Sequence, residues 1–372
     1  KNPDLVEPLQ DPKRSLVRFA KALQRTKGKS AGAITRVTHF GDSLIDLDHI
    51  SSELRHHYQK RYGDGGHGFT LGAKPWTWYN QYGLVHANGK SWTSYRVVGG
   101  TRIDYRLGLG GSAVEQKSGG GWLRIRATNA LSFSKLELWT MRQAGGGNIA
   151  VKIDSARVGS VSTGGAPRAP MFSSFKFADA THTISLRASG HVRVLGAVIE
   201  RAGPGVVWDN LPMVSVRFHQ LAKIDKRFFV EQLKHRNSDL VVFQYGANDT
   251  LSFGKSLEQY GQRIGVVLDR VREAIPDVSC IVIGPLDRLV RGKKGLHSPY
   301  VVRKVSDKQR EIAFSKGCAF WDGQRGMGGR GSMKWFLKRG LALKDMVHLQ
   351  PKGGAIVAKR FAAAIDAALT KY

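Results

Sequence analysis

Hydrophobic and amphipathic segments alternate at both ends of the chain. Residues 34–39 predict a strand, and the segment from Leu44 to about Tyr62 predicts the helix that follows it. Beyond residue 205, short continuous hydrophobic runs have the length of strands that are buried on both faces. The further segments are strands at 206–208, 240–243, 278–283 and 318–321, and helices at 15–25, 216–236, 257–275, 301–315 and 351–369.

Between about residues 67 and 203 the pattern changes to short segments in which apolar and polar residues alternate. Such alternation is typical of strands that are buried on one face. Many strands at short spacing, with no helical segment between them, predict a β-sandwich or jelly roll. The clearest segments are 94–98, 122–127, 135–140, 149–153, 181–186 and 192–198.

The single strand–helix unit at residues 34–62 cannot bury a core alone. We therefore expect residues 1–66 and 204–372 to form one discontinuous α/β domain, with residues 67–203 as an inserted β-sandwich domain. Strands that alternate with helices form parallel βαβ units covered on both faces. The predicted fold class is a three-layer αβα domain with a five-stranded parallel sheet, plus the all-β insertion.

The formal net charge of +29, from 58 Lys and Arg against 29 Asp and Glu, attracts polyanions such as nucleic acids, anionic lipids or acidic polysaccharides. The cations are scattered along the chain, and no zinc-ligand spacing or ribonucleoprotein motif accompanies them. We therefore expect non-specific polyanion attraction and no specific nucleic-acid partner. No hydrophobic run is long enough for a membrane span, so we expect a soluble chain.

Two cysteines, Cys280 and Cys318, lie in predicted buried strands. The pattern favours two small buried side chains, and a disulfide bond is possible only if the two strands are neighbours. Two cysteines leave the cellular compartment open. The histidines, including His56 and His57, have no metal-ligand spacing, so no metal site and no cofactor are predicted.

Polar residues stand where several of the predicted strands end. The sequence Gly41-Asp42-Ser43 follows the first strand, Asn248 follows a strand in the C-terminal half, and Asp345 and His348 precede the last helix. Each motif alone is typical of a turn or a helix cap. In a doubly wound sheet, however, ligands bind beyond the carboxyl ends of the strands, where these residues would meet.

Together these side chains can perform nucleophilic catalysis. A serine hydroxyl becomes an effective nucleophile when a base accepts its proton, and His348 can be that base for Ser43. Asp345, three residues before His348, can orient the imidazole and stabilise the imidazolium. The Asn248 amide and the backbone N–H of Ser43 can hold an oxyanion, each donor contributing roughly 3–4 kcal/mol. The predicted catalytic residues are therefore Ser43, Asp345 and His348.

These residues resemble the sequence blocks of the SGNH/GDSL hydrolase superfamily. Residues 41–44 are similar to its first block, 246–249 to its third and 345–348 to its fifth. Residues 317–333 resemble the C-terminal half of a bacterial subgroup that includes peptidoglycan O-acetylesterases. That subgroup carries a β-sandwich similar to a carbohydrate-binding module between the first and second blocks, where the β-rich stretch lies here. The resemblance covers nearly the whole chain after residue 30 and implies an SGNH-hydrolase-like, flavodoxin-like fold.

The second block of the family supplies a glycine to the oxyanion hole, but the matching stretch here, Asp209–Val216, contains none. The backbone N–H of Ser215 can replace it, because the donor belongs to the main chain, whereas Pro212 has no N–H. Gly110-Gly111 in the insertion is a more remote substitute. The predicted oxyanion hole comprises Ser43, Asn248 and Ser215, and the missing glycine leaves weak or selective catalysis as an alternative.

The resemblance implies a serine esterase that removes O-acetyl groups from a bacterial envelope polysaccharide, with O-acetylated peptidoglycan as the expected substrate. Such an SGNH-type carbohydrate esterase is a periplasmic or secreted enzyme of the cell wall, although no signal peptide is visible in the sequence. Two alternatives remain. One is a glycan O-acetyltransferase with the same triad, and the other is a catalytically impaired protein that binds glycans or polyanions.

An aromatic cluster stands near the start of the insertion. Trp76, Trp78 and Tyr79, with Tyr82 nearby, are candidates for stacking on the sugar rings of a bound glycan. The alternative is that these rings pack in the interface between the two domains.

Overall fold

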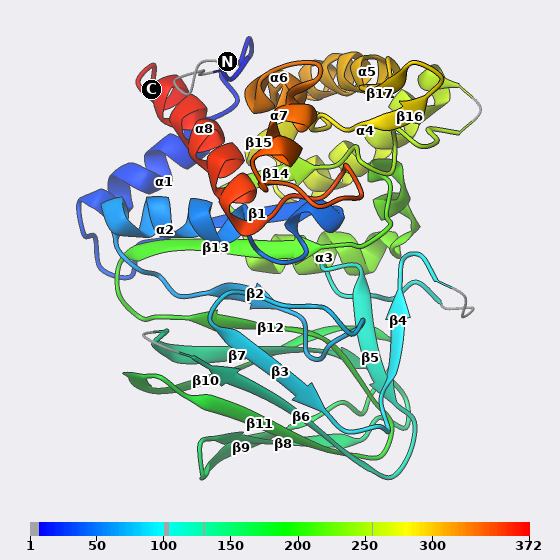
Figure 1. Cartoon of the computed structure of the whole chain (residues 1–372). Coiled ribbons are helices and arrows are strands. Elements are labelled where there is room, and N and C mark those ends of the chain that lie inside the picture. Colours follow the sequence, from blue (N-terminus) through cyan, green and yellow to red (C-terminus); the bar gives the residue numbers. More distant parts are fainter. Residues whose placement is uncertain (1–6, 100–103, 129–130, 255) are drawn as a thin grey trace.

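Three main sheets organise the computed structural model, which describes residues 7–99, 104–128, 131–254 and 256–372. One sheet is parallel and is covered by helices, and two antiparallel sheets lie on one side of this layered part (Figure 1). This arrangement confirms the predicted fold class. Within the described ranges, no helix is long and apolar enough to cross a membrane.

The parallel sheet has the strand order β13-β1-β14-β15-β18, so the N-terminal strand lies inside a sheet whose other strands follow the insertion. All neighbouring strands run parallel and in continuous register. The N-terminal segment therefore completes the same layer as the C-terminal half. The strands are β1 (Ile34–Gly41), β13 (Gly205–Pro212), β14 (Leu240–Gln244), β15 (Ser279–Ile283) and β18 (Ala319–Trp321).

Helices cover both faces of this sheet because its strands are apolar on both sides. Val37, Val242 and Ile281 pack into one core, and Phe40 and Phe243 pack into the other. The first core includes residues of α1 (Val17–Lys27), α2 (Ser51–Tyr62) and α8 (Pro351–Leu369), and the second includes residues of α3 (Lys226–Arg236), α4 (Leu257–Ala274) and α5 (Val301–Ser315).

The insertion forms two antiparallel sheets with a hydrophobic core of their own. One sheet contains β2 (Gly68–Thr70), β4 (Thr93–Arg96), β5 (Ser112–Gln116), β7 (Phe133–Arg142), β10 (Ala169–Ala180) and β12 (Val192–Glu200). The other has the order β3-β6-β11-β8-β9 and contains β3 (Leu84–Asn88), β6 (Gly120–Ala127), β8 (Asn148–Ile153), β9 (Ala156–Ser162) and β11 (Thr183–Ser189). The domain limits at residues 66/67 and 203/204 stay a prediction.

Two predicted helices are shorter than their hydrophobic patterns indicated. After β1 the chain forms a 3₁₀ turn, η1 (Ser43–Ile45), and α2 begins only at Ser51. Asp48 causes the delay, because it has φ of 58° and its carboxylate accepts a hydrogen bond from the Ser51 hydroxyl. The predicted helix at 216–236 is divided into η2 (Phe218–Lys223) and α3, which Asp225 caps through the N–H of Phe228.

Four short elements between β15 and α8 escaped prediction because each is too short to show a period. They include a small hairpin and two short helices whose positions depend on buried Asp287. Its carboxylate accepts hydrogen bonds from the Gln324 side chain and the Met333 N–H, both at 2.9 Å. The elements are β16 (Val290–Gly292), β17 (Gly295–His297), α6 (Gly323–Met327) and α7 (Ser332–Lys338).

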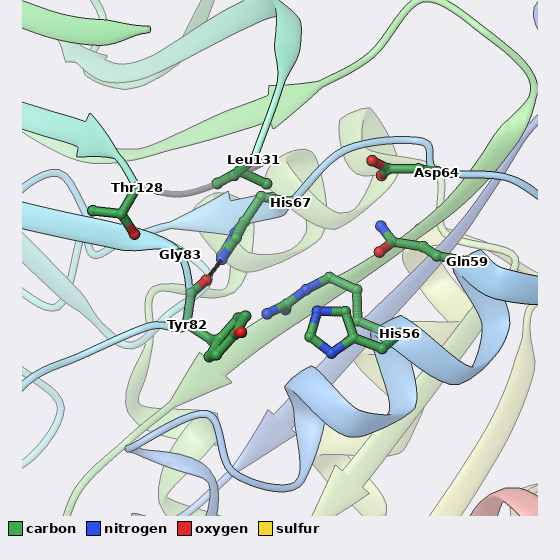
Figure 2. A pocket seen from close by; sticks show the side chains of 9 residues that line it. His56, Gln59, Asp64, His67, Tyr82, Gly83, Thr128 and Leu131 are labelled. Carbon is green, nitrogen blue, oxygen red and sulfur yellow. Dashed lines mark hydrogen bonds between the residues drawn. The ribbon is translucent and has the colours of Figure 1, made fainter. Parts of the chain in front are cut away.

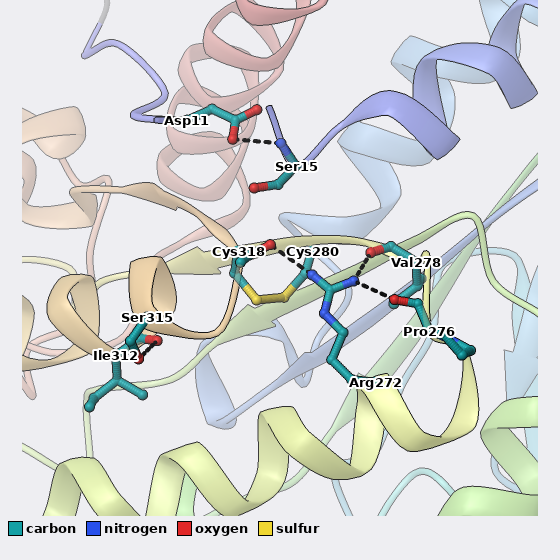
Figure 3. The surroundings of a disulfide bond; sticks show 10 residues. Asp11, Ser15, Arg272, Pro276, Val278, Cys280, Ile312, Ser315 and Cys318 are labelled. Atoms are coloured by element: carbon teal, nitrogen blue, oxygen red, sulfur yellow. Dashed lines mark hydrogen bonds between the residues drawn. A yellow bond between two sulfur atoms is a disulfide. The ribbon is translucent and has the colours of Figure 1, made fainter. Parts of the chain in front are cut away.

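Cys280 and Cys318 form a disulfide bond, so the preference for two free buried cysteines was wrong (Figure 3). Cys280 lies in β15, and Cys318 directly precedes its neighbour β18, which places the two Cα atoms 4.6 Å apart. The condition stated for a bond, that the two strands be neighbours, is met. Arg272 lies alongside and donates to the carbonyl oxygens of Val278 and Gly317.

A buried ionic network joins the insertion to the α/β domain. Arg236 of α3 donates to both carboxylate oxygens of Asp209 at 2.8 Å and to Glu200 at 2.6 Å. Asp209 also accepts the backbone N–H of Phe69 in β2, while Glu200, the last residue of β12, binds Arg36 of β1. Burial favours the neutral form of Glu200, but Arg236 and Arg36 outweigh it and hold the pKa of this carboxyl well below its usual range.

We predict that Arg236→Met lowers the free energy of unfolding by about 3–5 kcal/mol, because two buried carboxylates lose their shared countercharge. Chemical denaturation of the variant and the wild type measures the difference. Arg227→Met is the matched control, since it removes an exposed ion pair with Glu231 on the same helix and should change little. If both variants lost the same free energy of unfolding, the buried network would contribute no more to stability than the exposed ion pair does.

Candidate active site

Ser43 stands in a tight turn at the carboxyl end of β1, and Asp42 fixes this turn. The buried Asp42 carboxylate accepts the backbone N–H groups of Leu44, Gly246 and Ala247 at 3.0–3.2 Å. It therefore ties the Ser43 turn to the loop that follows β14. Burial raises the pKa of Asp42 to about 6, although these three donors act in the opposite direction.

Two glycines allow the backbone segments around this turn to approach closely. A Cβ atom on Gly41 would lie 2.7 Å from the Ile45 side chain and 3.1 Å from the carbonyl oxygen of Gln244. Gly246 has φ of 152°, and a Cβ atom there would lie 2.4 Å from Pro285. Larger residues at either position would push the two loops apart.

The structure brings the three predicted catalytic residues together in one hydrogen-bonded row. Ser43 Oγ lies 2.7 Å from His348 Nε2, and His348 Nδ1 lies 2.7 Å from Asp345 Oδ2. A carboxylate can only accept, so Nδ1 is the donor to Asp345. In the neutral imidazole, Nε2 is then free to accept the proton of the Ser43 hydroxyl.

The loop before α8 presets Asp345 for this contact. Its second carboxylate oxygen accepts the backbone N–H groups of Val347 and His348 at 2.9 and 3.0 Å. Burial acts to raise the pKa of Asp345, but these two donors and the imidazole outweigh it, so the pKa lies below its usual value. Asp345 is therefore ionised at neutral pH, as an imidazole-orienting group must be.

Two further loops meet beside Ser43 and carry the other predicted residues. The Asn248 side chain donates to the carbonyl oxygen of Val216 at 3.2 Å, and buried Asp249 accepts the N–H of Phe218 at 3.0 Å. These bonds fix the loop after β14 against the loop after β13, which contains Ser215. Burial raises the pKa of Asp249 to about 7.

Ser215 occupies the position where the resemblance expects a glycine, and its backbone has a conformation that glycine favours. Its φ is 64°, in the left-handed region that costs an ordinary residue roughly 1–2 kcal/mol. Within the described part of the chain, the N–H groups of Ser215 and Ser43 have no hydrogen-bond partner. Asn248 uses one of its two amide hydrogens, which leaves the other free.

A cavity of about 360 Å³ contains all these groups. Ser43, His348, Asn248 and Ser215 line it, so the candidate donors and the candidate nucleophile face one space. Of the rest of its wall, Trp78 and, within the first block, Leu44 were singled out from the sequence; the other residues carry no motif and were missed. These wall residues are Leu44, Asp46, Leu47, His49, Trp78, Val214, Leu343 and Leu349.

The aromatic cluster divides between the cavity and the core. Trp78 is 57% exposed and lines the cavity, so its glycan-binding role stays a prediction. Trp76 and Tyr79 are 8% and 0% exposed and belong to the core shared with the α/β domain, as the packing alternative stated. Their predicted role in sugar stacking is wrong, because their ring faces are covered by protein.

Asp46 links this aromatic segment to the turn that carries Ser43. It is buried, and the Trp76 indole N–H donates to its two carboxylate oxygens at 2.9 and 3.2 Å. Burial raises the pKa of Asp46 to about 7, while hydrogen bonds from Trp76 and Trp78 and the nearby His348 act to lower it. This role could not be predicted from the sequence, because Asp46 lay inside a predicted helix.

A second cavity, of about 340 Å³, lies between α2 and the insertion. Figure 2 shows His56 and Gln59 of α2 on one side and His67, Tyr82 and Thr128 on the other. His67 contacts the carbonyl oxygen of Tyr82 through Nε2 at 3.1 Å. Of the aromatic candidates for sugar stacking, Tyr82 lines this space, whereas none of the predicted catalytic or oxyanion-hole residues does.

We predict that Asp46→Asn changes how stability depends on pH. The folded-state pKa of Asp46, about 7, exceeds its ordinary value of 3.8, so the folded protein holds this proton more tightly than the unfolded chain. The wild type should therefore lose stability relative to the variant as pH rises from about 4 to 7. Denaturant unfolding of both proteins at several pH values measures this difference. A difference that stays constant with pH would contradict the prediction.

Residues 186–356 match the model of the GDSL-like Lipase/Acylhydrolase family. The matched segment contains Asn248, Asp345 and His348, whereas Ser43 lies on the other side of the insertion. Comparison with curated proteins gave no significant match.

Among solved structures, the chain is similar to a peptidoglycan O-acetylesterase, with 23% identity, a TM-score of 0.83 and coverage of 98% of this chain and 99% of that chain. It is more remotely similar to an acetyl xylan esterase (15% identity, TM-score 0.33, 43% of this chain and 81% of that chain). It is also remotely similar to the salicylyl-acyltransferase SsfX3 from a tetracycline biosynthetic pathway (12% identity, TM-score 0.34, 77% of this chain and 98% of that chain). The first likeness shows a shared fold over the whole length, and the last two support no functional argument. Through its matched segment the chain carries a domain of the GDSL-like lipase/acylhydrolase family and is a hydrolase that acts on ester bonds.

Proposed function

We propose that the protein is a serine esterase that removes O-acetyl groups from a bacterial envelope polysaccharide, with O-acetylated peptidoglycan as the substrate. The observation that carries the proposal is the hydrogen-bonded row of Ser43, His348 and Asp345 at the wall of an accessible cavity. The fold shared with a peptidoglycan O-acetylesterase supports the choice of substrate.

In the proposed reaction, Ser43 Oγ attacks the acetyl carbonyl carbon while His348 Nε2 accepts the hydroxyl proton. Asp345 holds the imidazole and stabilises the imidazolium. The imidazolium then donates this proton to the departing sugar oxygen, which leaves an acetyl-serine. Water, deprotonated by His348, attacks the acetyl-serine, and acetate leaves as the Ser43 hydroxyl is restored.

The oxyanion of each tetrahedral intermediate would be held by the backbone N–H groups of Ser43 and Ser215 and by the Asn248 amide. The three residues that carry these groups line the same cavity, and this supports the assignment. Donors fixed in advance stabilise charge that develops in the transition state more than the neutral ester. The exposed Trp78 would contact the sugar beside the ester.

A periplasmic or secreted location fits this substrate. The disulfide bond between Cys280 and Cys318 would persist in an oxidising compartment, whereas cytosolic thiols are kept reduced. The net charge of +29 would favour an anionic wall or envelope.

We predict that Ser43→Ala abolishes acetate release from O-acetylated peptidoglycan, and that Asp345→Asn lowers kcat by on the order of 10³–10⁴, because the imidazole loses its orienting carboxylate. Acetate is measured enzymatically, with Ser315→Ala as a control that removes an exposed serine hydroxyl elsewhere. Equal release by Ser43→Ala and the wild type would refute the mechanism.

The same assay separates the alternatives. Acetylated sugar formed from an added acceptor, in place of free acetate, would identify a transferase. If the protein does not hydrolyse even a small activated acetyl ester, the result would favour the alternative of a catalytically impaired protein that binds glycans or polyanions.

A second prediction concerns Ser215, whose backbone and not its hydroxyl is proposed to act. Ser215→Gly keeps the N–H and relieves the left-handed strain, so its kcat should equal or exceed that of the wild type. Ser215→Val disfavours this conformation and should lower kcat by about tenfold with little change in KM. Steady-state kinetics on a small acetyl ester gives both values. Identical kinetics for the Gly and Val variants would exclude Ser215 from the oxyanion hole.

A further inference from the structure

The outer sheet of the insertion presents an unusual surface to solvent. Its strands β6, β11, β8 and β9 lie at the far side of the molecule from the helices (Figure 1). Side chains alternate along each strand, so one set enters the sandwich core and the other points outward. The strand β6 shows this clearly, since Leu123 and Ile125 are buried and Trp122, Arg124 and Arg126 are exposed.

Five cations gather on this outward face: Arg124, Arg126, Lys152, Arg157 and Arg187. The strand registers place them side by side. Arg124 and Lys152 are both paired with Ser185, Lys152 is paired with Arg157, and Arg187 is paired with Trp122. Neighbouring strands are about 4.8 Å apart, so the face carries positive charge across four adjacent strands.

In the part of the chain that the structure describes, no carboxylate forms an ion pair with these cations. The five strands of the sheet contain no Asp or Glu. The acid in the β8–β9 turn, Asp154, is already bound to His182 and to the N–H of Thr183. Like charges that face each other across strands, such as Lys152 and Arg157, repel, and a bound anion would relieve the repulsion.

We propose that this basic face binds an anionic polysaccharide, a linear polymer that carries carboxylate or phosphate groups along its sugar chain. Guanidinium groups bind such anions through paired N–H donors. Trp122, which is 38% exposed and lies 5.7 Å from the Arg124 guanidinium, offers an apolar ring to a sugar. The cations on four adjacent strands suit an extended chain that crosses these strands.

A nucleic acid is the competing occupant, and the aromatic content of the face argues against it. Surfaces for single-stranded nucleic acids combine cations with several aromatic rings on which successive bases stack. Among the described residues of these five strands, Trp122 is the one exposed Trp, Tyr or Phe. The proposal concerns attachment to the envelope and does not depend on the proposed ester hydrolysis.

The test measures binding to polygalacturonate, a linear carboxylated glycan, by biolayer interferometry at about 50 and 200 mM salt, since salt screens such contacts. The triple variant Arg124→Gln, Lys152→Gln, Arg187→Gln should bind about tenfold or more weakly and depend less on salt, because fewer counterions are displaced. The charge-matched control carries Lys13→Gln, Lys21→Gln and Lys27→Gln, which lie on the α/β domain and should bind nearly as the wild type does.

Equal losses in the two triple variants would overturn the proposal, because binding would then follow net charge alone. Trp122→Ala should weaken binding to polygalacturonate without changing its salt dependence, and an unchanged affinity would argue against a sugar chain as the occupant. The proposal would also be overturned if the wild type bound a single-stranded DNA oligonucleotide more tightly than polygalacturonate and the triple variant of Arg124, Lys152 and Arg187 lost that binding. Turnover of a small acetyl ester should be the same in all these variants, which separates this proposal from the proposed function.

Discussion

The contact between Arg236 and Asp209 is the interaction on which the arrangement of the two domains depends. Asp209 receives hydrogen bonds from α3 of the α/β domain, from Thr38 of the neighbouring strand β1 and from β2, the first strand of the insertion. Glu200, where the insertion ends, shares the same guanidinium. The entry and exit of the insertion are thereby held on one buried charge cluster, which fixes how the sandwich sits beside the strand ends.

Buried carboxylates also hold the segments of the candidate site together. Three loops from three strands meet there, and buried carboxylates fasten them by accepting backbone N–H groups. Asp42 joins the first loop to the second, and Asp249 joins the second to the third. Ser43, Ser215 and Asn248, which line the cavity, therefore belong to loops that these hydrogen bonds hold in place. Fixed dipoles are effective because they need no reorganisation when charge develops.

The sequence was most informative where a physical period or a motif repeats over enough residues. Parallel strands, long helices and the meeting of Ser43 with His348 followed from such patterns, because strand ends converge at one edge of a sheet. Contacts made by single side chains were not foreseeable. Asp48 shifts the start of α2 to Ser51, and the Trp76 indole binds the buried carboxylate of Asp46. The proximity of Cys280 and Cys318 depends on strand order, which the sequence pattern does not reveal. The left-handed backbone of Ser215 could not be predicted either, because a serine in the sequence, unlike a glycine, does not indicate a positive φ.

The separation of 305 residues between Ser43 and His348 has a consequence for the timing of activity. A ribosome makes chains from the N-terminus, so the serine emerges early and its base emerges after the whole sandwich and most of the helices. A nascent or C-terminally clipped chain would hold a hydroxyl with no partner to take its proton. Under the proposed mechanism, the chain would therefore not react with esters until the segment that carries His348 has been synthesised and has folded against Ser43.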